Sequence, residues 1–566
     1  MKNNPIKNHS TVVKIPIFIA LSLVVGILLG ATFFGGQAPK NNIQNGASKF
    51  KEILTLIEGN YVDSVNTDTL VDYAILKMLA KLDPHTTYFP ITEAPLVRSQ
   101  LEASFDGIGI EFAIVHDTVY VMSAIKGGPA NIAGIKSGDI LLKADNVSLT
   151  GAGITQNAIY NRLRGKRGSE LILEVLHEND KTTNNITVVR DRIPSFSVSA
   201  SYMLDHQTGL IKVERFTEST YNEFKNSLIS LKNQGLKRLV LDLRGNPGGY
   251  KDRAEKLVDE LLGGEHTIVF TRGKSKQYNS VTTTSFEGVF EKGAVIILID
   301  ENSASASEIV AGALQDNDRA LIVGRRSFGK GLVQMPVSLN DGSELRLTIS
   351  RYFTPSGRSI QKPYQSVSID DYDKDYDNRI KSGELFHEDS IKFDKKVTYR
   401  TLNGRRVYGG GGIMPDVFIP FDTLYSSNYL RSLMEQNIIR QYAIGYCLRN
   451  ERTLEKLAFK DFNKFFVVTS TMMDEIVRMA SRAKIKMRAN EYLRSENYIK
   501  TLVKATIART IWQRQINNGL NNEYYQVMSA EDETLHQALR YFDKAEKMAR
   551  GEVIETISHA HNKSLK

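Results

Sequence analysis

The sequence predicts a multidomain α/β protein, for three reasons. Its 566 residues leave room for about three or four domains, and a hydrophobic content of 41% is enough for buried cores. Two apolar runs, residues 238–243 and 294–300, each lead through a turn into a segment with helical spacing, which is typical of strands that alternate with helices. From residue 426 to the end, the pattern is almost entirely helical and contains no proline.

The first predicted element is a transmembrane anchor. Residues 15–34 form an uncharged stretch of twenty mostly apolar residues, which is long enough to cross a bilayer. Three lysines precede it, so the positive-inside rule places residues 1–14 in the cytoplasm and the rest of the chain outside. A cleaved signal peptide is the alternative, since Gly36 and Ala38 suit a small-residue cleavage site. We expect the uncleaved anchor because the stretch exceeds the usual apolar region of a signal peptide.

Helical spacing resumes from Phe50 to Leu82. It predicts a helical segment over residues 45–100, which would either cap the core domain or form a dimer contact.

Glycine motifs mark the next module, residues 101–191. The sequence GIGIEF begins at Gly107, and GPAxxAGIKSGDILL begins at Gly128. These motifs resemble a PDZ domain of the circularly permuted bacterial kind. Successive main-chain N–H groups in such a loop can capture a free carboxylate while a peptide extends an open sheet edge. The loop residues expected to bind a substrate C-terminus are Gly107, Ile108, Gly109 and Ile110.

A plainer interpretation of this loop is a tight entry into a strand. The basic segment 164–168 that follows leaves three roles open, namely contact with the core domain, contact with the substrate, or a solvated turn.

Two short stretches, SASASE from Ser303 and FGKG from Phe328, suit a serine nucleophile and its lysine base. A serine hydroxyl needs a neighbouring group to take its proton, and a lysine can do so when desolvation lowers its pKa. Ser305 follows the apolar run 294–300 at the start of a predicted helix, so its hydroxyl is exposed beside free main-chain N–H groups. Lys330 opens a predicted strand, and a period of two puts Gln334 on its face.

These two stretches also have two other interpretations. Serines before a helix are commonly only N-caps. Gly324, Gly329 and Lys330 match the phosphate-loop spacing, but that motif needs Ser or Thr next and this chain has Gly331. The sequence therefore disfavours a nucleotide-dependent factor.

Several motifs, in order along residues 48–420, resemble the C-terminal processing peptidases, also called tail-specific serine proteases. They are LDPH from Leu82, LDLRGNPGG from Leu241, SASASEIVAGALQDN from Ser303, FGKGLVQ from Phe328, YFTPSGR from Tyr352 and GGIMPD from Gly411. The resemblance implies an α/β serine-peptidase core over residues 192–420. It assigns Ser305 as nucleophile, Lys330 as general base and Gln334 as the residue that orients the lysine.

An oxyanion hole is also expected, because acyl transfer develops negative charge on the carbonyl oxygen. The N–H of Ala306 is one candidate donor, and the N–H of Gly248 or of Gly249 is the other. Asp316 is excluded as a third catalytic group because it lies about 16 Å along the same helix from Ser305.

The remaining features assign little chemistry. His85 and His266 are expected to be structural or on the surface, and a single cysteine, Cys447, excludes an intramolecular disulfide. Residues 373–384 follow the spacing of a calcium loop but carry Asn378 in place of its glycine, so we expect a solvated loop and no metal or other cofactor. A net charge of +9, spread along the chain without interleaved aromatics, gives no reason to expect nucleic acid.

Together these observations predict a serine endopeptidase anchored by one span in a bacterial inner membrane, with its catalytic part in the periplasm or outside the cell. Its expected partners are protein or peptide substrates with free C-termini and the membrane itself. Residues 421–566 would form a helical extension that packs on the peptidase or makes a homo-oligomer, and a regulatory adaptor remains open. The alternative function is a non-catalytic PDZ scaffold or adaptor of the cell envelope.

Overall fold

The structure is a computed structural model, which describes residues 18–26, 42–99, 101–115, 117–151, 153–177, 181–365, 371–372, 374–391, 397–512 and 519–554. The chain divides into two compact units, Met1–Met78 and Leu79–Lys566. The division falls inside the helical segment predicted for residues 45–100. Each unit is described by itself.

Besides the helical residues 18–26, the described part of the first unit contains α2 (Asn42–Asn60) and the greater part of α3 (Thr67–Leu79). Helix α2 buries none of its residues. Residues 18–26 are helical, and the rest of the predicted anchor, residues 15–34, lies outside the described residues. Within the described part of the chain, no helix has both the length and the apolar composition needed to cross a membrane.

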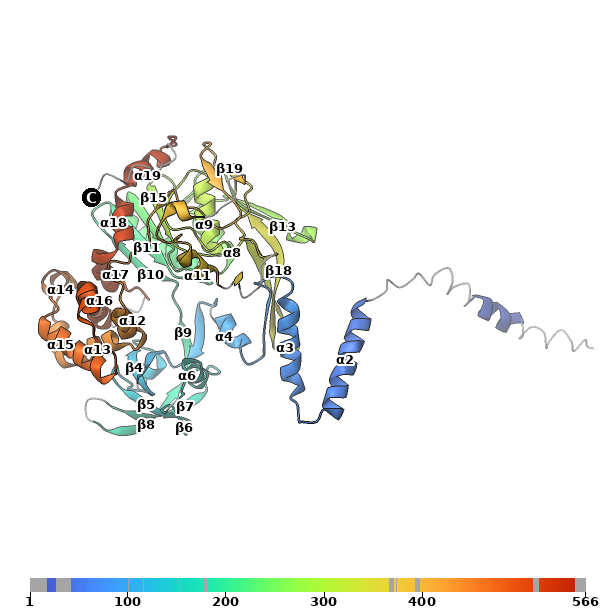
Figure 1. Cartoon of the computed structure of the whole chain (residues 1–566), viewed down its shortest axis with the longest axis horizontal. Coiled ribbons are helices and arrows are strands. Elements are labelled where there is room, and N and C mark those ends of the chain that lie inside the picture. The colour runs from blue at the N-terminus through green and yellow to red at the C-terminus, as the bar shows by residue number, and fades with distance from the viewer. Residues whose placement is uncertain are drawn as a thin grey trace, which may run out of the picture. The chain divides into compact units, whose positions relative to one another are not determined.

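A six-stranded sheet forms the centre of the second unit (Figure 1). Its order is β10 (Val198–Met203), β11 (Thr208–Val213), β12 (Arg238–Asp242), β15 (Ala294–Ile299), β16 (Leu321–Gly324) and β21 (Val417–Phe418). Strand β10 is antiparallel to β11 and the other neighbours are parallel. The apolar runs 238–243 and 294–300 are thus confirmed as buried strands. Parallel strands place their carboxyl ends at one edge, where α/β proteins carry their sites.

Three helices pack against one face of this sheet. They are α7 (Thr220–Asn233), α8 (Lys251–Asp259) and α9 (Ala306–Asp316). Their apolar residues share one buried cluster with Ile211, Leu241 and Ile297 of the sheet. Helix α9 confirms the helix predicted to follow Ser305, and all of its residues are buried.

A second sheet stands beside the first and carries the strand predicted after Lys330. It contains β1 (Thr87–Phe89), β18 (Glu344–Phe353), β13 (Thr267–Gly273) and β14 (Ser280–Thr283), and β17 (Leu332–Ser338) pairs with β18. The β17–β18 pairing is antiparallel and shifts register between Val333 and Gln334. Short elements around both sheets are α4 (Ala94–Ser99), α11 (Asp375–Lys381), β19 (Thr398–Arg400) and β20 (Arg406–Tyr408).

The segment predicted as a PDZ domain has its own sheet and its own hydrophobic core. The sheet order is β3 (Ile110–Val115), β4 (Thr118–Ala124), β5 (Ile140–Ala144), β7 (Glu170–Leu176) and β8 (Thr183–Val189), with β6 (Val147–Ser148) beside β5. Helices α5 (Pro129–Ile132) and α6 (Gln156–Leu163) complete it. Strands β2 (Ser104–Gly107) and β9 (Asp191–Pro194) pair where the chain enters and leaves this domain.

The C-terminal extension, predicted as one helical region, consists of two parts that pack differently. Its first part has a core of its own, formed by α12 (Asn428–Glu435), α13 (Ile438–Leu454), α14 (Phe459–Phe465), α15 (Ser470–Arg482) and α16 (Ala489–Trp512). Cys447 is buried there. Its second part, α17 (Asn522–Met528), α18 (Glu533–Leu539) and α19 (Phe542–Ala549), lies along the peptidase sheet (Figure 1). Packing of the extension on the core is therefore confirmed.

The second part of the extension completes the main hydrophobic core. Leu535, Phe542 and Met548 pack against the face of the six-stranded sheet opposite α9, in one cluster with Ile296 and Leu298 of β15. Both faces of β15 are buried.

The candidate calcium loop has a different backbone from the one its spacing suggested. Asp373 lies outside the described residues, and residues 375–381 form helix α11. The carboxylate of Asp375 pairs with Lys362 at 3.1 Å. No group of metal-ligating side chains is found among the described residues.

Candidate active site

One cavity of about 900 Å³ in the second unit brings together the residues predicted from separate motifs. Six predicted residues line it, namely Gly248, Gly249, Ser305, Ala306, Lys330 and Gln334. They come from the turn after β12, the start of α9 and the start of β17. The four residues of the predicted carboxylate loop do not line this cavity.

Ser305 lies at the turn between β15 and α9 in an unusual backbone conformation. Its φ of 55° and ψ of −112° are rare for a residue with a side chain. Ser305 is also the N-cap residue of α9 and forms a capping box with Glu308, as the plain N-cap interpretation of the SASASE motif expects. Its strained backbone goes beyond that interpretation, because such strain is characteristic of functional residues that the surrounding structure must hold in place.

A buried carboxylate, Glu308, joins the serine segment to the lysine segment. Its Oε2 atom accepts hydrogen bonds from the main-chain nitrogens of Ser305 and Lys330, each at 2.8 Å. Its Oε1 atom accepts from the Gly329 nitrogen at 2.7 Å and from the Ser327 hydroxyl at 2.5 Å. Burial raises the pKa of Glu308 to about 7, although these hydrogen bonds favour the charged form. Sequence reasoning assigned Glu308 no role, although a Glu three residues after a Ser is a recognised capping pattern.

The surroundings of Lys330 shift its pKa in the direction that a lysine base requires. Burial lowers the pKa of its amine, the nearby charge of Arg346 lowers it further, and the charges of Glu308 and Asp83 oppose both effects. The buried Tyr352 hydroxyl lies 2.5 Å from the Lys330 carbonyl oxygen and 3.1 Å from that of Ser305. This tyrosine therefore links the same two segments that Glu308 joins.

Gln334 lines the cavity with Lys330 but has another hydrogen-bond partner. Its side-chain nitrogen donates to Thr348 Oγ1 at 3.3 Å, and that hydroxyl donates to Asp83 Oδ1 at 3.1 Å. The register shift at Val333 breaks the simple two-residue period on which the predicted pairing with Lys330 rested.

His85 also lines the cavity, which sequence reasoning did not anticipate. Its Nε2 atom lies 2.9 Å from the Tyr372 hydroxyl, and its main-chain nitrogen donates to Asp83 Oδ1 at 2.8 Å. Burial, followed by the charge of Lys330, lowers the pKa of His85 to about 3. This histidine is therefore neutral beside the lysine. The LDPH motif was the available signal, but the sequence could not show that it meets a strand 250 residues later.

The glycine turn after β12 touches the serine directly. A Cβ atom on Gly248, whose φ is 97°, would lie 2.7 Å from Ser305 Cβ. The Gly248 nitrogen donates to Asn246 Oδ1 at 2.8 Å. Phe216 and Gly249 form an isolated β-bridge, in which the Phe216 N–H donates to the Gly248 carbonyl oxygen and the Tyr250 N–H donates to the Phe216 carbonyl oxygen. The Gly249 N–H takes no part in these two hydrogen bonds. The Gly248 N–H is thus already bonded within the turn, and the Gly249 N–H has no such partner among the described contacts.

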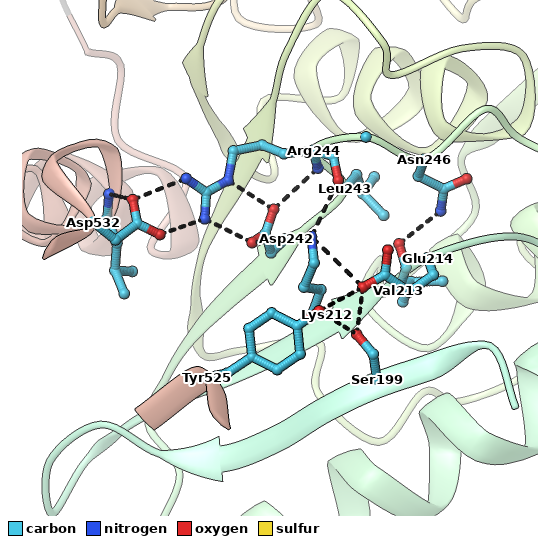
Figure 2. A network of polar contacts seen from close by, with 12 residues as sticks. Ser199, Lys212, Val213, Glu214, Asp242, Leu243, Arg244, Asn246, Tyr525 and Asp532 are labelled. Carbon is cyan, nitrogen blue, oxygen red and sulfur yellow. Dashed lines mark hydrogen bonds and ion pairs between the residues drawn. The ribbon is translucent and has the colours of Figure 1, made fainter. Parts of the chain in front are cut away.

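The start of that turn is held by charged groups (Figure 2). Arg244 donates through Nε to Asp242 Oδ1 at 2.9 Å and through Nη2 to Asp242 Oδ2 at 2.7 Å. Burial opposes ionisation of Asp242, but the charges of Arg244 and Lys212 outweigh it and hold its pKa below the ordinary value. The Lys212 amine donates to the Arg244 carbonyl oxygen at 3.1 Å.

The predicted carboxylate loop is largely covered by neighbouring side chains. Gly107, Ile108 and Gly109 are buried and Ile110 is half-buried. The Arg164 guanidinium lies 4.5 Å from the centre of the Phe105 ring and donates to the Ser99 hydroxyl at 2.8 Å. Of the roles left open for the basic segment 164–168, the structure places Arg164 against α4.

These observations define a class of protein, a serine-type peptidase with an α/β core and a PDZ domain. The sequence patterns of known families agree. Residues 207–370 match peptidase family S41, residues 107–188 match the PDZ domain, and residues 429–513 match a family of unknown function, DUF8443.

Proteins of similar sequence show the family to which the chain belongs. A carboxy-terminal-processing protease of Bartonella bacilliformis is 35% identical over 348 residues, which are 60% of this chain and 79% of the relative. The carboxy-terminal processing protease CtpB of Bacillus subtilis is 32% identical over 352 residues, or 61% of this chain and 71% of the relative. The chain belongs to the carboxy-terminal processing proteases, as its motifs predicted.

Solved structures are similar over parts of the chain. The photosystem II D1 C-terminal processing protease is 27% identical, with a TM-score of 0.31, over 56% of this chain and 84% of that one. The PDZ domain of the carboxy-terminal protease from Vibrio cholerae, solved in complex with a peptide, is 27% identical with a TM-score of 0.15, over 16% of this chain and 97% of that one.

Proposed function

We propose that this protein is an endopeptidase that cleaves through Ser305 with Lys330 as the general base. One observation carries the proposal. The buried carboxylate of Glu308 binds the main-chain nitrogens of both residues, so the hydroxyl-bearing and amine-bearing segments are fixed to each other at one cavity. Burial favours the neutral amine that a base requires.

The proposed reaction has two halves. The Ser305 hydroxyl oxygen attacks the scissile carbonyl carbon while Lys330 takes the hydroxyl proton. Collapse of the tetrahedral intermediate breaks the C–N bond, and Lys330 returns the proton to the leaving amine. A water, deprotonated by the lysine, then attacks the carbonyl carbon of the acyl-enzyme. The acyl C–O bond breaks, and the lysine returns the proton to the Ser305 oxygen. The N–H groups of Ala306 and Gly249 are the proposed oxyanion donors, and Gly248 remains the alternative.

The PDZ domain is the proposed reader of substrate C-termini. Strand β3 is an edge of its sheet, so a peptide can add beside it, with its carboxylate on the loop of residues 107–110. The side of β3 that carries Phe112 packs against Tyr160 of α6, ring centres 5.1 Å apart, which gives the proposed groove an apolar wall. The substrate class is therefore proteins with an accessible, apolar free C-terminus.

We further propose a single-pass anchor in a bacterial inner membrane, formed by residues 15–34, with the peptidase in the periplasm or outside the cell. The support is the apolar, uncharged sequence of that stretch and the three lysines before it. Fractionation of cells followed by protease treatment of intact spheroplasts tests this. An anchored form should sediment with membranes and be digested from outside, whereas a cleaved form would be released.

The cleavage proposal is tested on the full chain with a disordered protein that ends in an apolar free C-terminus. Wild type should cut it and be insensitive to chelators, Ser305→Ala and Lys330→Ala should be folded and inert, and the exposed Lys292→Ala should match wild type. A folded wild type that binds the tail without cutting it would favour the alternative, a non-catalytic PDZ scaffold or adaptor.

A further inference from the structure

We propose that Asp532, in the C-terminal extension, is a positioning residue of the peptidase site. It would act through Arg244, which begins the glycine turn whose N–H groups are the proposed oxyanion donors. The inference rests on the proposed cleavage reaction and extends it to a part of the chain outside the residues matched by the peptidase family.

The contact itself is two-pronged. Arg244 Nη1 donates to Asp532 Oδ1 at 2.9 Å, and Arg244 Nη2 donates to Asp532 Oδ2 at 2.7 Å. Figure 2 shows the guanidinium between the two carboxylates of Asp242 and Asp532. Planar, bidentate pairs of this kind fix orientation as well as distance. The Arg244 side chain is 20% exposed and that of Asp532 is 23% exposed, so the pair is well shielded compared with an ordinary surface ion pair.

Two carboxylates share the Arg244 guanidinium. Asp242 lies 2.7 Å from the guanidinium and 3.5 Å from the Lys212 amine, and that amine also lies 4.0 Å from Glu214. Asp532 is the second carboxylate on the guanidinium. Asp242 and Asp532 both raise the pKa of Arg244 against the effect of burial.

A short hydrogen-bonded path leads from Arg244 to the serine. The next residue, Gly245, donates its N–H to Asp300 Oδ1 at 3.0 Å, and the Asn246 side chain donates to the Val213 carbonyl at 2.8 Å. Asn246 Oδ1 in turn accepts the Gly248 N–H. Gly248 is in contact with Ser305. A displacement of Arg244 is therefore passed along a five-residue turn to the oxyanion donors.

The position of Asp532 is itself fixed by the core. Its Oδ1 atom accepts the Leu535 N–H at 2.9 Å and so caps helix α18. Leu535 is buried against the peptidase sheet. The packing of α18 on the sheet therefore holds Asp532 beside Arg244. Moving the aspartate away would expose buried residues of that packing to water.

The chain offers a matched control at the other end of the same strand. Arg238, the first residue of β12, pairs with Glu546 of α19 at 2.7 Å. This pair also joins the extension to the sheet, but it lies at the end of β12 away from the glycine turn. Glu546→Gln therefore removes an ion pair between the same two parts of the molecule without touching the proposed oxyanion donors.

The test uses full-chain Asp532→Ser, which keeps a helix cap but removes the partner of Arg244, together with Asp532→Glu and Glu546→Gln. For Asp532→Ser, kcat on the disordered protein substrate should fall about tenfold or more with KM nearly unchanged, because the oxyanion donors act in the transition state. Asp532→Glu should recover part of kcat, and Glu546→Gln should keep the wild-type value. An unchanged kcat in Asp532→Ser, or an equal loss in Glu546→Gln, would overturn the proposal.

Amide hydrogen exchange tests the positioning role of Asp532 independently of activity, and so applies even if the protein cleaves no substrate. In Asp532→Ser, the amides of Gly245, Asn246, Gly248 and Gly249 should exchange faster. Those of α9 should stay protected, and Glu546→Gln should leave the turn unchanged. Unchanged protection of the turn would show that Asp532 does not position it, whatever the activity of the protein.

Discussion

The Oε2 atom of Glu308 lies 2.8 Å from the main-chain nitrogen of Lys330, and the same atom accepts the Ser305 N–H. One oxygen therefore sets the spacing between two segments that are 25 residues apart in the sequence. The arrangement explains why an acidic residue is buried in the first turn of α9.

Replacing Glu308 with Gln should lower kcat about 100-fold, because an amide offers one acceptor oxygen where four donors converge and its NH₂ group would face a donor. Steady-state kinetics on the protein substrate measure the loss. Glu308→Asp, which keeps the charge but shortens the reach, should retain more activity than Glu308→Gln. Equal activity of wild type and Glu308→Gln would contradict this.

The same carboxylate predicts a pH-dependent stability. Its pKa is raised from 4.5 in the unfolded chain to about 7 in the fold, so its contribution is fully present below pH 4.5 and is lost as pH rises through 7. The free energy of unfolding of wild type, measured against Glu308→Gln, should fall by about 3 kcal/mol between pH 4.5 and pH 8. Urea unfolding at several pH values gives the difference, and a difference that is flat across this range would refute the assignment.

The rate of cleavage should rise with pH as Lys330 loses its proton, with a midpoint below 10.5 because burial lowers the pKa of the amine. Arg346 lowers this pKa as well, so Arg346→Gln should move the midpoint to higher pH. Arg215→Gln, which removes another charge from the cavity lining, serves as the control. A pH profile of kcat/KM that is the same in wild type and Arg346→Gln would be inconsistent with Lys330 as the base.

Gly248→Ala should abolish cleavage and destabilise the fold, because its Cβ would lie 2.7 Å from both Ser305 Cβ and the Ala304 carbonyl oxygen. Gly245→Ala is the matched control. It also has a positive φ, of 73°, but no atom lies within 4 Å of the added Cβ, so it should cost only about 1 kcal/mol of backbone strain. Thermal unfolding and kinetics separate the two effects. Similar losses of activity and stability in both variants would show that the backbone conformation of the glycine, and not its contact with Ser305, causes the loss.

Ser305→Gly should be inactive yet more stable than Ser305→Ala by about 1 kcal/mol, since glycine adopts the φ of 55° without the strain that a side chain suffers. Denaturant midpoints of the two variants test this directly, because both lack the hydroxyl. Equal midpoints would mean that the backbone at Ser305 is not strained.

Short, ordered motifs predicted which segments the cavity brings together. Ser305 and the glycine turn each follow an apolar run that becomes a strand of the central sheet, and the resemblance of the ordered motifs assigned Lys330 to the same site. The hydrogen bond from Gln334 to Thr348 could not be predicted, because the fold sets the pairing of β17 with β18 and its register shift.

Contacts between residues far apart in the chain could not be predicted from the sequence. His85 reaches the cavity through β1, which pairs with residues more than 250 positions later, and nothing local in the sequence indicates that pairing. Asp532 looked like one charged residue among many in a helical region, and only the docking of α18 on the sheet brings it to Arg244. The local pattern fixes what a residue is able to do, while the fold decides which residue it meets.

Helices α18 and α19 cover one face of the central sheet, and both follow every strand of that sheet in the sequence. Until these helices dock, apolar residues of β15 such as Ile296 and Leu298 have no cover on that side. The sheet therefore becomes complete only when residues 533–549 have folded against it. A chain interrupted before α18 would leave this apolar face in water, where it favours aggregation.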